Sequence, residues 1–168
     1  MYHRFDEQKY PSTNIQISIF KEQIELIEKL NINFLNPKDF GKNYTKVNNK
    51  KTILITIDDG FQSFYEKAWP YLKDKKIPFL LFISTEAVGK NGYMNWNQII
   101  EIEKSGLGII GNHSHAHSYL TDLDNNETIA DIEKSINIFK NKMGYNPIYF
   151  SYPFGEYSIS LKKIIKKN

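Results

Sequence analysis

The stretch ILITIDDG, residues 53–60, points both to a buried strand and to a functional site at its end. Four branched apolar residues and a threonine form a run that is rich in β-branched side chains and too short for a helix. Two adjacent carboxylates, Asp58 and Asp59, end this run. Because successive strand side chains point to opposite faces, the two can have different roles. Adjacent carboxylates repel each other, so a fold that keeps both balances them with a positive charge or a proton.

Three of the four histidines of the chain follow another short apolar run, residues 107–111. His113, His115 and His117 therefore also lie at the end of a predicted strand. Two histidines and one aspartate would hold a divalent metal and leave positions open for water and substrate. The alternative is a pair of capping aspartates with surface histidines. That alternative would explain the aspartate pair alone or the histidines alone, but it explains their occurrence together less well. We therefore expect a metal site.

Predicted strands and helices alternate along the whole chain, which indicates one α/β domain over residues 1–168 with a mainly parallel sheet, open or closed into a barrel. Ser18 is the expected N-cap of the first helix, with Leu30 on its buried face, and Gly144 is the expected C-cap of the fourth. In parallel sheets and barrels the catalytic and ligand-binding residues lie at the carboxyl ends of the strands. The expected strands are 1–5, 53–57, 78–83, 107–111 and 147–151, and the expected helices are 18–30, 64–75, 95–105, 127–143 and one from 158.

The composition argues against several functional classes. The chain has 168 residues, a net charge of +3 and no cysteine, which excludes disulfides and thiolate chemistry. Its lysines are not accompanied by an arginine-rich stripe or a nucleic-acid-binding motif, so no nucleic-acid partner is expected. No stretch reaches the roughly 18 apolar residues of a membrane span. The polar N-terminus does not resemble a signal peptide, so we expect a cytoplasmic location for the chain as written. The oligomeric state is not indicated.

Several short motifs resemble those of the polysaccharide deacetylases, carbohydrate esterase family 4. TIDDG at 56–60 is similar to the T-F-D-D-G motif, and GNHSHAH at 111–117 contains the H-[ST]-x-x-H motif. FSYPFG at 150–155 is similar to the third motif, usually R-x-P-Y, with Ser151 in place of the arginine. The opening YH at 2–3 resembles the start of the permuted branch, which includes the biofilm poly-N-acetylglucosamine deacetylases. The resemblance spans nearly the whole chain.

The resemblance implies a distorted (β/α) barrel. The family fold has about seven strand–helix units, and about five are recognisable here, so we expect an incomplete barrel with an exposed strand edge.

The resemblance also assigns catalytic roles. Asp58 would be the catalytic base, and Asp59, His113 and His117 would hold a divalent metal, most often Zn²⁺. In the permuted branch the N-terminal histidine is the general acid, which makes His3 the candidate here.

Other residues have supporting roles by the same resemblance. Pro153 and a backbone amide near Phe154 would bind substrate and stabilise the oxyanion. Ser114 would steady the histidine loop by hydrogen bonding. His115, between the two metal ligands, is interpreted as an ordinary loop or core residue.

The function implied is metal-dependent hydrolysis of N-acetyl groups on N-acetylglucosamine-type residues of a cell-envelope or extracellular polysaccharide. Relatives with such substrates are mostly periplasmic or extracellular. One alternative is a non-catalytic glycan-binding module with the same fold. Another is an amidohydrolase-type site that uses His113 and His115, although that chemistry generally needs further histidines from later strands. A phosphoacceptor receiver would use the acidic pair and leave the histidines without a role.

Overall fold

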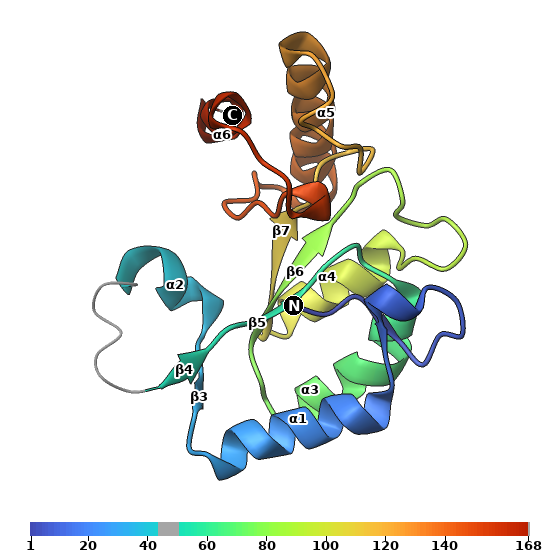
Figure 1. Cartoon of the computed structure of the whole chain (residues 1–168), viewed down its shortest axis with the longest axis vertical. Coiled ribbons are helices and arrows are strands. Elements are labelled where there is room, and N and C mark those ends of the chain that lie inside the picture. The colour runs from blue at the N-terminus through green and yellow to red at the C-terminus, as the bar shows by residue number, and fades with distance from the viewer. Residues whose placement is uncertain (44–50, 168) are drawn as a thin grey trace.

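A three-stranded parallel sheet forms the centre of the computed structural model, which describes residues 1–43 and 51–167. The strands lie in the order β5 (Ile55–Ile57), β6 (Phe79–Ile83) and β7 (Gly108–Asn112). Helices α3 (Trp69–Asp74) and α4 (Trp96–Lys104) provide the crossovers that parallel neighbours require (Figure 1). The predicted α/β alternation with a parallel sheet is therefore confirmed.

Single bridges extend this sheet at both edges. Tyr2 bridges Ile57 on one side, next to the pair of β1 (Arg4–Phe5) and β2 (Asn14–Ile15). At the other edge Phe150 bridges Asn112, the last residue of β7. Across the described ranges the strands do not close into a barrel.

The strand predicted over 147–151 is reduced to a single bridge at Phe150, which is held by hydrogen bonds from the Asn112 N–H to the Tyr149 carbonyl and from the Ser151 N–H to the Asn112 carbonyl. Pro147 has no N–H for a sheet ladder. The side chain of Ile148 is 83% exposed and contributes little to the core. The strand predicted over 53–57 is also interrupted. Its first part, β4 (Thr52–Ile53), pairs with β3 (Asn33–Phe34), beside α2 (Pro37–Asn43), at the left of Figure 1.

The first helix, α1 (Ile17–Lys29), begins before the predicted cap, Ser18. Its first backbone N–H, that of Ile17, donates instead to the Asp6 carboxylate at 2.9 Å. A tertiary contact thus replaces the local cap, which sequence periodicity alone does not reveal. Leu30, predicted on the buried face, is 57% exposed just beyond the end of the helix.

Helix α5 (Asn125–Met143) starts two residues before its predicted beginning because Asp124 caps it. The Asp124 side chain accepts hydrogen bonds from two backbone N–H groups of the first turn. Gly144 ends the helix with φ 84°, as predicted. Helix α6 (Ile159–Lys167) packs against α5 at the end of the molecule opposite α1 (Figure 1).

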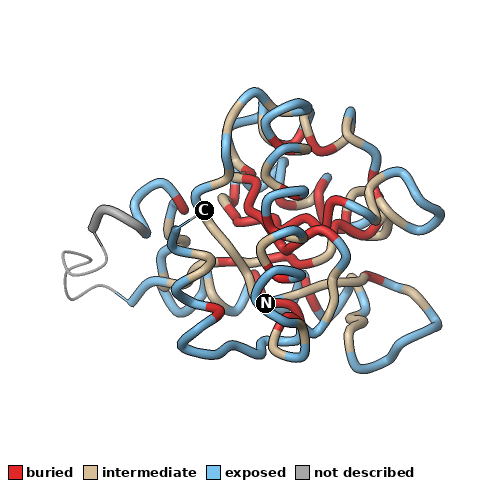
Figure 2. The backbone as a smooth tube through the Cα atoms, turned by 90° about the horizontal axis from the view of Figure 1, so that it is seen from above, coloured by how far each residue is buried: buried red, intermediate tan, exposed pale blue. Residues whose placement is uncertain are grey.

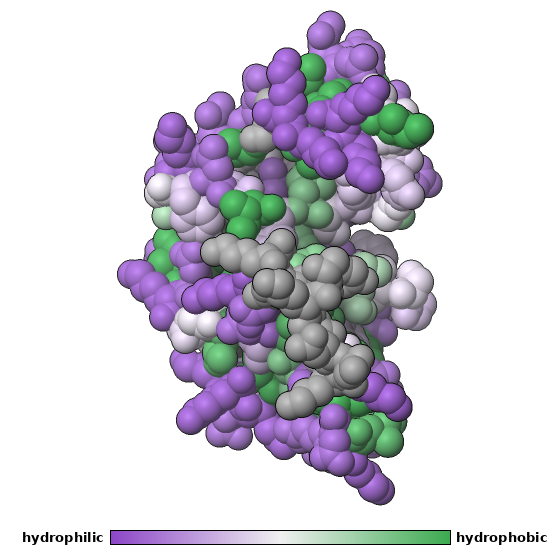
Figure 3. All heavy atoms as spheres, turned by 90° about the vertical axis from the view of Figure 1, so that its left-hand side faces the viewer, coloured by the Kyte–Doolittle hydropathy of each residue, from purple (hydrophilic) through white to green (hydrophobic). Residues whose placement is uncertain are grey.

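The buried residues form one main cluster around the sheet and a smaller one beneath α5 and α6. Figure 2 shows the buried backbone gathered in the interior and the exposed backbone in peripheral loops and helices. Hydrophilic side chains gather over the α5–α6 end of the surface in Figure 3. In residues 1–43 and 51–167, none of the helices has the length and apolar character needed to cross a bilayer.

Candidate metal centre

The site lies at the carboxyl ends of β5 and β7 and is shaped by unusual backbone geometry. Four non-glycine residues there have left-handed backbone: Asp59 (φ 73°), Ser114 (φ 68°), His117 (φ 54°) and Phe154 (φ 58°). Such conformations cost on the order of 1–3 kcal/mol each and cluster at functional sites. Asp59 turns the chain after β5, and Ser114 and His117 turn it after β7, while Phe154 lies in the Pro153–Gly155 turn.

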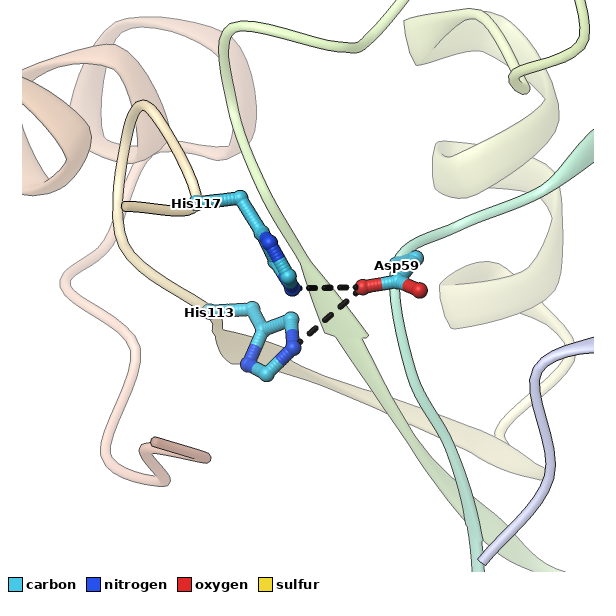
Figure 4. A group of neighbouring side chains, drawn as sticks. All are labelled: Asp59, His113 and His117. Atoms are coloured by element: carbon cyan, nitrogen blue, oxygen red, sulfur yellow. Dashed lines mark ion pairs between the residues drawn. The ribbon is translucent and has the colours of Figure 1, made fainter. Parts of the chain in front are cut away.

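Asp59, His113 and His117 offer three ligand atoms that lie within 4.8 Å of one another. Asp59 Oδ1 is 3.3 Å from His113 Nε2 and 3.1 Å from His117 Nε2 (Figure 4). Atoms about 2 Å from a tetrahedral zinc are about 3.3 Å apart, so these separations match those between ligands of one ion. The buried Oδ1 makes no hydrogen bond within the described part of the chain.

The tautomer of His113 supports a cation between these atoms. Its Nδ1–H donates to the carbonyl oxygen of Ser151 at 2.8 Å, and a carbonyl can only accept. In the neutral ring Nε2 therefore carries a lone pair directed at the Asp59 carboxylate. Two such acceptors repel unless a metal ion or a proton lies between them. The donor set thus fits a divalent metal.

The charges within this group are strongly perturbed. Burial opposes the charged form of Asp59, but His113 and His117 outweigh it and hold the pKa of the carboxyl well below its usual range. Burial likewise opposes the charged form of His113, but the nearby carboxylates raise its pKa. The carboxylates at this site therefore stabilise positive charge beside them, and a divalent cation bound to neutral imidazoles would supply that charge in place of a proton.

Asp58 stands apart from the three candidate ligands. It is 3% exposed, and its Oδ2 accepts a hydrogen bond from the Ser151 hydroxyl at 3.3 Å. Its Oδ1 is buried and has no hydrogen-bond partner in the ranges that the structure describes. Burial raises the pKa of Asp58, which makes it a stronger base than an exposed aspartate.

A cleft of about 660 Å³, named here the His3 cleft, brings the predicted site residues together. His3 lies on its wall and is partly buried. Burial lowers the pKa of His3, against the opposing effect of the Asp59 and Asp58 charges. The lining of the cleft includes His3, Asp58, Asp59, His113, His117 and Phe154.

Pro153 and Phe154 form a short 3-10 turn beside the two histidines. Pro153 is buried, whereas Phe154 is 50% exposed. The Phe154 ring lies 4.7 Å from that of His117 and stacks on Tyr119 at 3.7 Å. The turn therefore places an aromatic wall at the mouth of the His3 cleft.

The loop that carries the histidines is held from several directions. The Ser114 hydroxyl accepts a hydrogen bond from the His117 N–H at 3.0 Å. His115 is buried, and its Nδ1 hydrogen-bonds the Thr85 hydroxyl at 2.9 Å, away from the three ligand atoms. This contact agrees with the interpretation of His115 as a structural residue.

Asp131, on α5, was not identified from the sequence. Its two carboxylate oxygens accept hydrogen bonds from the backbone N–H groups of His115 and Ala116, each at 2.8 Å. Both groups lie between the two histidine ligands. In the sequence Asp131 is one acid on an amphipathic helix, and no local pattern distinguishes it from its solvent-facing neighbours.

Comparison with known proteins places the chain among enzymes of one family. The family model for polysaccharide deacetylase matches residues 45–168. The poly-beta-1,6-N-acetyl-D-glucosamine N-deacetylase of Staphylococcus epidermidis is 30% identical over 163 residues, which are 89% of this chain and 56% of that protein. A putative polysaccharide deacetylase of Bacillus subtilis is 25% identical and is covered over 60% of its length. The chain thus spans less than two thirds of these curated relatives.

Solved structures show the same relationship. IcaB from Ammonifex degensii superimposes with a TM-score of 0.89 at 27% identity, over 99% of this chain and 77% of that one. The Streptococcus pyogenes deacetylase PplD superimposes with a TM-score of 0.88 at 20% identity, which supports the fold alone. The predicted relationship to the biofilm deacetylase branch is therefore confirmed.

Proposed function

Because the chain belongs to the polysaccharide deacetylase family, we propose that it removes N-acetyl groups from N-acetylglucosamine residues of a cell-envelope or extracellular polysaccharide. The reaction adds water across the amide C–N bond and gives acetate and a free amine. One observation carries the proposal: three candidate metal ligands converge beside a separate, buried carboxylate, Asp58. This separation provides a cation site and a base in one cleft.

We assign Asp59, His113 and His117 to a divalent metal, with Zn²⁺ as the first choice, because two imidazoles and one carboxylate suit zinc. When bound, the metal would polarise the acetamido carbonyl and lower the pKa of a water molecule. His113 is held in the required tautomer by the Ser151 carbonyl.

Asp58 then takes a proton from the attacking water. Its Oδ2 is held by the Ser151 hydroxyl, and its Oδ1 remains to accept that proton. The Ser151 hydroxyl thus takes the place of the family arginine that orients the base. His3, on the wall of the same cleft, donates a proton to the departing amine nitrogen. The lowered pKa of His3 makes its protonated ring a stronger acid than free histidine.

The carbonyl oxygen that becomes negative needs a hydrogen-bond donor. We assign this role to the backbone N–H of Phe154, in the turn that starts at Pro153 and borders the His3 cleft. The positive φ of Phe154 sets the direction of this peptide group.

We further propose that residues 1–168 act as one domain and that their strands belong to a distorted barrel. The bridges at Tyr2 and Phe150 support this proposal, because they continue the sheet at both edges. A non-catalytic glycan-binding module is not favoured, because such a module has no need for the buried base at Asp58.

Acetate release from β-1,6-linked N-acetylglucosamine oligomers, measured with and without added zinc, tests the proposed function. We expect release by the wild type with zinc, and loss of release in Asp58→Asn. Asp74→Asn removes the same charge from the exposed end of α3 and serves as the matched control. Zinc-independent release, or full activity of Asp58→Asn, would contradict the assigned roles.

A further inference from the structure

Asn112, the last residue of β7, carries a buried amide that none of the proposed catalytic steps uses. Its Nδ2 donates to the hydroxyl of Ser135 on α5 at 2.7 Å. That hydroxyl is itself fully buried and donates to the Ile132 carbonyl at 2.8 Å. The end of the strand is therefore tied to the helix by a chain of hydrogen bonds inside the protein, at the foot of α5 in Figure 1.

This amide costs stability that an apolar side chain would avoid. The Asn112 Oδ1 is buried and makes no hydrogen bond to any residue in the ranges 1–43 and 51–167. A buried acceptor without a partner is destabilising, whereas a leucine of similar size would leave no polar side-chain atom unpaired at this position. The structure around Asn112 must therefore give the amide another use.

The backbone of Asn112 shows what that use is. Its N–H donates to the Tyr149 carbonyl at 2.8 Å, and its carbonyl accepts from the Ser151 N–H at 3.0 Å. These two bonds make the bridge at Phe150 that attaches residues 149–151 to the sheet. Ser151 therefore takes its position from the same strand end that the amide ties to α5.

Ser151 contacts both parts of the proposed catalytic site. Its carbonyl accepts from His113 Nδ1–H at 2.8 Å, and its hydroxyl donates to Asp58 Oδ2 at 3.3 Å. His113 also follows Asn112 directly in the chain. A displacement of the strand end would therefore move a metal ligand and the support of the base together.

Helix α5 holds this region at a second point. Asp131 lies four residues before Ser135, so the two side chains project from the same face of the helix. Asp131 accepts hydrogen bonds from the backbone N–H groups of His115 and Ala116, while Ser135 accepts from the Asn112 amide. One face of α5 thus supports the strand end and the histidine loop that follows it.

We propose that Asn112 is a positioning residue for the deacetylation site, acting with Ser135 and through Ser151. The amide fixes the end of β7 on α5, and the backbone of the same residue passes this position to Ser151, which keeps the base and the His113 ligand at their working separation. The inference rests on the proposed deacetylase function. It gives α5 a part in the reaction although neither Asn112 nor Ser135 lines the His3 cleft.

The test measures kcat and KM for acetate release from a β-1,6-linked N-acetylglucosamine pentamer at saturating zinc. Ser135→Ala and Asn112→Leu each remove the hydrogen bond between the amide and the hydroxyl. We expect kcat to fall about three- to tenfold in each variant and KM to stay within about twofold, because displaced catalytic groups slow the chemical step while substrate contacts remain. The double variant should fall no further than the more affected single variant, since both changes remove the same bond.

Ile24→Val is the matched control for stability. It removes one methylene from a fully buried side chain of α1, at the end of the molecule opposite α5 and α6 (Figure 1). Urea unfolding measures the loss of stability in every variant. If Ser135→Ala and Asn112→Leu lose stability but keep the wild-type kcat, as Ile24→Val should, the role is confined to folding and the inference is overturned.

Zinc binding, measured by competition with a chromophoric chelator, separates this inference from failure of the proposed function. Looser orientation of His113 should raise the zinc dissociation constant about three- to tenfold in Ser135→Ala and leave that of Ile24→Val unchanged. If the wild type releases no acetate, the deacetylase proposal is wrong and zinc affinity alone decides. The expected difference would then support the positioning of the metal ligands, and equal affinities would overturn it.

Discussion

Replacing Asp131 by asparagine should weaken metal binding while the protein remains folded. Both oxygens of this carboxylate accept backbone hydrogen bonds, from His115 and Ala116, in the loop between two proposed ligands. Asparagine keeps one acceptor and presents an NH₂ group to the other backbone N–H. One charge-assisted hydrogen bond is lost, and a donor then faces a donor.

The magnitude follows from the two contacts. A hydrogen bond to a charged group contributes about 1.5–3 kcal/mol, and the lower value applies here because one of the two bonds is exposed and the other only partly buried. Asp131→Asn therefore costs about 1.5 kcal/mol, or about tenfold in the dissociation constant. Asp131→Ala loses both bonds, about 3 kcal/mol in all, or roughly a hundredfold. Substitution of a residue that hydrogen-bonds or positions the ligands typically lowers metal affinity by about 10- to 100-fold, which includes both values.

The assay is zinc binding by competition with a chromophoric chelator, accompanied by urea unfolding of the metal-free proteins. Unfolding shows how much of the cost falls on the fold rather than on the metal site. Glu133→Gln is the matched control, since it removes the same charge from an exposed position of α5 two residues away. Zinc affinity unchanged in both Asp131 variants would refute the positioning role, because the loop would then hold its ligands without this carboxylate.

Three further predictions concern the site and the sheet. Asp58→Asn should lower acetate release by about 10²–10⁴-fold and leave zinc binding largely intact, and a parallel loss of zinc binding would contradict the division of roles. Asp59→Ala should abolish the zinc-dependent rise in Tm seen by calorimetry, and an undiminished rise would exclude Asp59 as a ligand. Gly111→Ala should destabilise the protein by about 1–3 kcal/mol in urea unfolding. The added Cβ would lie 2.6 Å from Phe82, so unchanged stability would show that this ring moves freely.

The sequence predicted the elements whose signals are local. Strand β6 reads as an uninterrupted apolar run, and its five residues are all buried. Asn95, before α4, and Gly144, after α5, mark helix ends through their own side-chain or backbone properties. The strand predicted at 147–151 forms only a single bridge, because local composition does not decide which residues find a partner strand.

Part of the site was also predictable and part was not. The aspartate pair and the spacing of the histidines indicate a metal site, since few other kinds of site use carboxylate and imidazole groups together at strand ends. Asp131 carries no such local signal. Its significance comes from its contact with His115, a residue distant in the chain.

The sequence by itself determined the donor atoms, because imidazole and carboxylate chemistry belongs to the side chains wherever they lie. Only the tertiary structure decided where the carboxylates of Asp58 and Asp59 lie and which groups each one contacts. The left-handed backbone at Asp59 turns its carboxylate toward His113 and His117, while Ser151 holds Asp58 through its hydroxyl and His113 through its carbonyl. The physical reason is that charge balance and hydrogen-bond direction act over a few ångströms in space. Residues far apart in the chain reach such distances only once it has folded.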